Sequence, residues 1–170
     1  MDEKTDFVIC SFADTLDGKD TNQSFNFTPL IIQEIMLAAP AGHYLAEKDH
    51  VRVSDLNNQP FISYSNLSGI RPLMHKILNT HNVSPHFQYE LEEDQSVLGF
   101  VKNGLGVALT PNTNLISNQV IIRHLEDNDI VQRLYLVTKR EHLLTPSAIR
   151  LRNYFFDYCK KNYTDKGKLL

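Results

Sequence analysis

The chain has 170 residues, of which 42% are apolar and 22% are charged. This composition is typical of a compact globular domain with a hydrophobic core, and it excludes a mostly disordered or coiled-coil chain. With 17 Lys and Arg against 20 Asp and Glu, the net charge of −3 argues against a protein that binds nucleic acid through its overall charge.

The first half of the chain alternates short apolar segments with polar ones. From Ile70 to Leu78, apolar residues recur at the spacing of a helix, with Ser68 as the expected N-cap and Pro72 in the first turn. The expected strands are residues 6–10, 30–39 and 61–64, and the polar residues 14–26 are expected to form a loop.

The second half continues this alternation. A short helix is expected after Asp94 or Ser96 as its cap, with Gly104 ending it, and Thr145 with Pro146 predicts the start of the last helix. The expected strands are residues 87–91, 107–109, 120–122 and 134–137. Strands that alternate with helices predict an α/β fold with largely parallel sheets.

The targeting and redox features point to the cytoplasm. The two cysteines, Cys10 and Cys159, lie near opposite ends of the sequence without metal or redox spacing, so we expect free thiols. No signal peptide is recognisable at the start, and the longest apolar stretch, residues 35–41, is too short to cross a bilayer. We therefore expect a cytoplasmic protein that makes no contact with a membrane.

Motifs of catalysis and cofactor binding are missing from the sequence. The glycines of Gly104-Leu105-Gly106 follow a helix and lack a third glycine, so a helix stop and a tight turn are favoured over a cofactor loop. The seven histidines show no i, i+4 pair for a metal, and the acidic run of residues 90–94 fits a solvated strand end. We expect no enzyme activity, no cofactor and no metal.

A candidate ligand site follows the strand at residues 61–64. Ser65, Asn66 and Ser68 offer hydrogen bonds, the N–H groups at a helix start favour an anion, and Arg71 adds a positive charge. This arrangement suits a small carboxylate in a crevice beyond the strand ends. The same residues fit equally well a capped turn that carries a surface arginine.

Several segments resemble the effector-binding domain of LysR-type transcriptional regulators. The family's opening strand is similar to Asp6-Phe7-Val8-Ile9, and its "V-x-x-G-x-G-i-a-x-l-P" segment is similar to residues 97–111. Residues 35–46 and 53–62 resemble two further family segments, although Tyr44 stands where the family usually has proline. The resemblance extends from Asp6 to Cys159.

The resemblance implies the two-lobed α/β fold of type 2 periplasmic binding proteins. Residues 1–39 and 134–170 are expected to form a first lobe without its opening elements, and residues 40–133 a second lobe. An effector would bind between the lobes. The family pattern implies Ser65, Asn66, Ser68 and Thr110 as effector-binding residues, with Arg71 as an addition.

The resemblance also implies partners. The expected partner is a small-molecule effector, while DNA would be bound only by a separate winged helix-turn-helix domain that has no counterpart in this sequence. The strand at Phe7–Ile9 would lie at a bare sheet edge, so we expect a homo-oligomer. The alternative is a solute-binding domain of related fold that serves transport.

Overall fold

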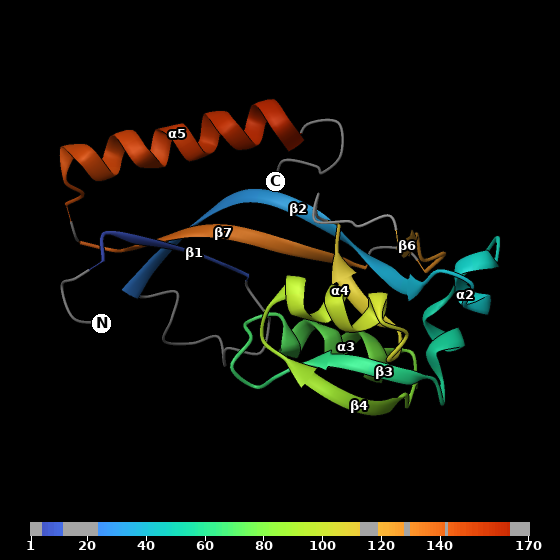
Figure 1. Cartoon of the computed structure of the whole chain (residues 1–170). Coiled ribbons are helices and arrows are strands. Elements are labelled where there is room, and N and C mark those ends of the chain that lie inside the picture. The colour runs from blue at the N-terminus through green and yellow to red at the C-terminus, as the bar shows by residue number, and fades with distance from the viewer. Residues whose placement is uncertain (1–4, 12–23, 113–118, 128–129, 142, 164–170) are drawn as a thin grey trace. The chain divides into compact units, whose positions relative to one another are not determined.

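The computed structural model describes residues 5–11, 24–112, 119–127, 130–141 and 143–163 (Figure 1). Most of the expected loop at residues 14–26, and the end of the chain after Tyr163, lie outside the described residues. The strands are β1 (Phe7–Ser11), β2 (Phe25–Pro40), β3 (Pro60–Tyr64), β4 (His86–Leu91), β5 (Ala108–Pro111), β6 (Val120–Arg123) and β7 (Val131–Lys139). The helices are α2 (Tyr44–Glu47), a 3-10 helix (Val53–Leu56), α3 (Arg71–Thr80), α4 (Asp94–Lys102) and α5 (Pro146–Tyr163).

The chain divides into two compact units. Unit 1 consists of Met1–Gln33 and Gln132–Leu170, and unit 2 consists of Glu34–Val131. Strand β2 passes through the first boundary, and β7 begins one residue before the second, so both strands belong in part to each unit. The assignment of residues 1–39 with 134–170 and of residues 40–133 to two family lobes stays a prediction.

Unit 2 is built around strands β3, β4 and β5. Strands β3 and β4 pair in parallel from Pro60↔His86 to Tyr64↔Leu91, and Phe61 forms a parallel bridge with Val107 just before β5. Strands β5 and β6 both pair with β2. The carboxyl ends of β3 and β4 therefore lie next to each other, and from these ends the chain continues to α3 and α4 respectively (Figure 1).

The expectation of largely parallel sheets is wrong. The pairs β1–β7, β2–β5 and β2–β6 are all antiparallel. Two consecutive strands pair in parallel only when a crossover connection joins them. Among the named strands, only β3 and β4 form such a pair, with α3 in the crossover. The alternation of strands and helices in the sequence does not reveal which strands become neighbours.

The helices of unit 2 pack on a continuous core. Helix α3 buries Met74, Ile77 and Leu78, in agreement with its predicted apolar face. Ser68 is not its N-cap: Ile70 occupies that position, without a side-chain cap hydrogen bond, and the helix begins at Arg71. Helix α4 likewise begins at Asp94 with Glu93 as N-cap, so neither expected cap of α4 holds that position.

Two glycines shape the turn between α4 and β5. Gly104 has φ +73°, which confirms the predicted left-handed helix stop. Gly106 has φ +153°, and a Cβ atom there would lie 2.7 Å from the carbonyl oxygen of Pro60. The turn requires glycine at this position because it brings the backbone directly against β3.

Unit 1 packs α5 and its sheet around a small cluster. The Thr145 hydroxyl accepts the N–H of Ala148 at 3.2 Å, which confirms the predicted start of the last helix. The buried members of the cluster are Leu30, Ile31, Leu136 and Cys159. Cys10 and Cys159 are both free thiols. Among the described residues, no helix combines the length and the apolar character needed to cross a membrane.

Candidate functional site

A buried hydrogen-bond group lies where β3, β5 and α4 meet. The Tyr64 hydroxyl donates to Asp94 Oδ1 at 2.6 Å, and the Thr110 hydroxyl lies near the same tyrosine and donates to the carbonyl of Pro111 at 3.4 Å. Tyr64 is 1% exposed and Thr110 2% exposed. Burial, and then the Asp94 carboxylate, raise the pKa of Tyr64. The hydroxyl therefore stays protonated and holds the start of α4 against the ends of the two strands.

The turn after β3 uses several of its own polar groups. The Ser65 N–H donates to the carbonyl of Leu91 at 2.8 Å, and the Ser65 hydroxyl accepts the N–H of Leu67 at 3.3 Å. The Arg71 N–H donates to the carbonyl of Ser68 at 3.2 Å. Pro72, the next residue, has no N–H. The start of α3 thus offers fewer free donors than the sequence predicts.

Arg71 is engaged between the ends of β3 and β4. One terminal nitrogen of its guanidinium donates to the carbonyl oxygen of Tyr64 and lies 2.8 Å from Glu90 Oε1. The Arg71 side chain is 25% exposed and that of Glu90 47%. Arg71 therefore ties the two strand ends together, and its charge is paired.

The structure brings the predicted ligand residues to one end of unit 2. Ser65, Asn66, Ser68 and Arg71 share the turn and helix start that follow β3, and Thr110 reaches the same strand end through Tyr64. Asn66 is exposed and Ser68 half-buried. Their role as effector ligands stays a prediction.

Sequence reasoning missed the partners Tyr64, Glu90 and Asp94. Tyr64 was treated only as part of a strand, Glu90 as part of a solvated acidic run, and Asp94 as a helix cap. The parallel pairing Tyr64↔Leu91 is the signal for Glu90, because it places this residue beside the turn that carries Arg71.

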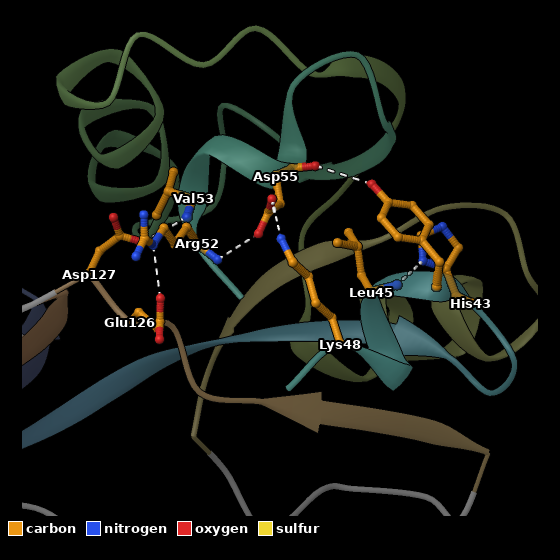
Figure 2. Close-up of polar contacts among 9 residues, drawn as sticks. His43, Leu45, Lys48, Arg52, Val53, Asp55, Glu126 and Asp127 are labelled. Atoms are coloured by element: carbon orange, nitrogen blue, oxygen red, sulfur yellow. Dashed lines mark hydrogen bonds and ion pairs between the residues drawn. The ribbon is translucent and has the colours of Figure 1, made fainter. Parts of the chain in front are cut away.

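A second polar group of unit 2, the Arg52 cluster, comprises Lys48, Arg52, Asp55, Glu126 and Asp127 (Figure 2). Arg52 Nε lies 2.8 Å from Glu126 Oε2, and the Arg52 N–H donates to Asp55 Oδ2 at 2.8 Å. Lys48 Nζ lies 2.6 Å from Asp55 Oδ1. Asp127 accepts the N–H of Val53 at 2.7 Å. The cluster fastens two segments that are 74 residues apart in the sequence.

The pKa values in the Arg52 cluster reflect this pairing. Burial acts to raise the pKa of Asp55, but hydrogen bonds from Lys48 and from the Arg52 backbone outweigh it and hold this pKa below its ordinary value. The hydrogen bond from Arg52 lowers the pKa of Glu126. These paired charges therefore fix the backbone segments that carry them. The described residues also contain no group of three or more side chains suited to a metal ion.

Comparison with known proteins places most of the chain in one family. Residues 2–160 match the family model described as LysR substrate binding domain. The HTH-type transcriptional regulator CysL of Bacillus subtilis (strain 168) is 22% identical over 152 residues, which cover 87% of this chain and 50% of that protein. The chain spans about half the length of the curated relatives it matches.

Solved structures show the same fold. The effector binding domain of QuiR in complex with shikimate has a TM-score of 0.81 and 25% identity, with 94% of this chain and 74% of that chain covered. The regulatory domain of Synechocystis PCC6803 CcmR in complex with 2-PG has a TM-score of 0.80 and 20% identity, with coverage of 94% and 76%. The mixed α/β fold predicted from the sequence is thereby confirmed as that of an effector-binding domain of the type 2 periplasmic-binding-protein class.

Proposed function

Because this chain belongs to the LysR substrate-binding domain family, we propose that it is the effector-sensing part of a transcriptional regulator. It would bind a small molecule between its two lobes and thereby change how a separate winged helix-turn-helix domain engages DNA. The observation that carries the proposal is the family match over residues 2–160. Its relatives are regulators, which favours sensing over solute transport.

The site residues in unit 2 suit such a role. Ser65, Asn66 and Ser68 lie on a short turn at the end of β3, and Thr110 lies at the end of β5. Polar groups at strand ends in an otherwise apolar unit are typical of small-molecule sites. We propose that this turn contributes residues to the effector site.

Signalling would follow from a difference in affinity between two lobe arrangements. A ligand shifts the equilibrium between the two arrangements only by the difference between its binding free energies for them. DNA contact would come from a domain outside this sequence. The homo-oligomer expected from the sequence is also a proposal, and it is supported by β1, which ends its sheet and pairs only with β7 among the described strands.

Thermal melting with a panel of small molecules tests the proposal. The panel would contain shikimate, benzoate, benzamide, benzylamine and the common amino acids. A ligand that is present at a hundred times its Kd stabilises the folded protein by about 2.7 kcal/mol, so a true effector produces a clear rise in Tm.

Site variants show whether the rise comes from the proposed turn. Replacing Asn66 and Ser68 together by Ala should weaken the ligand about tenfold, since each change removes a hydrogen-bonding group. Asn79→Ala, at an exposed position of α3 away from the turn, is the matched control and should leave the shift unchanged. A panel without any stabilising compound, or a shift insensitive to the double variant, would contradict the proposed site.

A further inference from the structure

Arg71 is the one cation that the sequence places at the proposed effector turn, and its guanidinium is already paired. We infer that Glu90 sets the charge specificity of this site, so that the site takes an uncharged polar ligand or an amine and rejects a carboxylate. This inference rests on the proposed function, because it concerns the ligand class of the same site.

The first argument is the geometry of the pair between Arg71 and Glu90. The guanidinium nitrogen that lies 2.8 Å from Glu90 Oε1 also donates to the carbonyl of Tyr64. A carboxylate ligand that approached this guanidinium would lie close to Glu90, which would repel it and compete with it for the same positive charge. Glu90 is therefore an internal competitor for any anion at this position.

The second argument is the balance of charge around the strand ends. Asp94 adds a carboxylate that is held 2.6 Å from the Tyr64 hydroxyl. The three groups Arg71, Glu90 and Asp94 together carry one net negative charge. His75, one turn further along α3, does not compensate, because burial and then the nearby Arg71 lower its pKa.

The third argument is that two of the positions expected to offer N–H groups at the start of α3 do not. An anion at a helix start is held by unbonded N–H groups. Here the Arg71 N–H is bonded to Ser68, and Pro72 has none. The hydroxyl of Ser65 already accepts a hydrogen bond from Leu67, and hydroxyl and amide groups suit a neutral polar ligand at least as well as an anion.

The local potential can be measured without knowing the effector. In Ser65→Cys, the new thiol would lie at the turn, next to the strand end that carries Glu90. We would measure its rates of reaction with a positively and a negatively charged methanethiosulfonate reagent of similar size, resolved by peptide mass spectrometry. Ser84→Cys, at an exposed serine of the same unit, is the matched control.

We expect the positive-to-negative rate ratio to be at least about threefold higher at position 65 than at position 84, and to fall in high salt. Glu90→Gln should lower the ratio at position 65, whereas Glu47→Gln, at an exposed position of α2, should not. A ratio at position 65 equal to or below that at position 84 would overturn the inference. Asn66→Cys provides the same readout if Ser65→Cys fails to fold.

Thermal melting with ligands distinguishes a failure of this inference from a failure of the proposed function. Benzylamine or benzamide should raise the Tm of the wild-type protein more than benzoate does, and Glu90→Gln should shift the preference toward benzoate. If benzoate stabilises the wild-type protein and Arg71→Gln abolishes that effect, the inference fails while the proposed function stands. If no panel compound raises the Tm, the proposed function fails, and the rate ratio still decides the charge at the turn.

Discussion

Units 1 and 2 differ greatly in the apolar surface that each encloses. Unit 2 holds one cluster of twenty-five buried residues, whereas the cluster of unit 1 has four among the described residues. Unit 1 also leaves Leu151, Tyr154 and Tyr158 exposed along α5. The comparison teaches that the proposed effector turn stands on the better-packed part of the chain, where its geometry is fixed by a continuous core.

The largest effects should come from removing the same side chain in each unit. Leu109→Ala in unit 2 should lower the free energy of unfolding by about 4 kcal/mol, and Leu136→Ala in unit 1 by about 2 kcal/mol. Both leucines are at most 1% exposed, so the difference reflects how many buried neighbours each cavity affects. Urea unfolding followed by far-ultraviolet circular dichroism measures both losses, since the chain has no Trp. Equal losses would break the comparison.

The turn that connects α4 to β5 should be the next most sensitive place in unit 2. Gly106→Ala should cost about 3 kcal/mol, because its Cβ would approach the Pro60 carbonyl oxygen at 2.7 Å and its φ is +153°. Gly104→Ala should cost about 1 kcal/mol, since it has an unfavourable φ of +73° but open space around it.

Gly99→Ala is the control for that pair. It lies inside α4, and beyond the helix's own backbone no atom lies within 4 Å of the added carbon, so the substitution should stabilise the protein by about 0.5 kcal/mol. The four Tm values should decrease in the order Gly99→Ala, wild type, Gly104→Ala, Gly106→Ala. If Gly106→Ala melts above Gly104→Ala, the close approach to β3 does not constrain the turn.

The smallest effect should come from the charges of the Arg52 cluster. The pKa of Asp55 is lowered in the folded protein, so its contribution is fully present above its ordinary pKa near 4 and is lost as the pH falls through the folded value. Asp55→Asn should therefore reduce stability by about 0.5 kcal/mol at pH 7 and by progressively less below pH 4.

Unfolding curves between pH 3 and pH 7 measure this dependence. Glu47→Gln, which removes an exposed carboxylate of α2 outside the cluster, should leave the pH profile unchanged. A destabilisation by Asp55→Asn that is the same at all pH values would show that packing, not charge, accounts for the role of Asp55.

Local structure was the part of the fold most accessible from sequence. The apolar spacing from Ile70 to Leu78 predicts α3, Thr145 with Pro146 predicts the start of α5, and Gly104 predicts a helix stop, because each signal lies within a few residues. The family motifs predict the overall fold, which composition and periodicity alone do not reach.

Pairings over long distances were not accessible in this way. The antiparallel partners of β2 lie about seventy or more residues away, so no local pattern reports them. The Arg71–Glu90 pair and the Arg52 cluster depend on which strands and segments meet. The candidate turn was therefore found from sequence, but the groups that set its charge were not.

Strand β2 runs for sixteen residues and supplies backbone to both units. Successive side chains of a strand point to opposite faces of the sheet. In an uninterrupted strand such as β2, the side chains of both halves therefore follow a single alternation. Inserting a single residue near Gln33 would reverse the faces of one half relative to the other, so the half that pairs with β5 from Ile35↔Pro111 onward and the half before it could not both keep their present registers. Evolutionary changes of length in this strand should therefore occur in steps of two residues, whereas the surface loops on either side are free of that restriction.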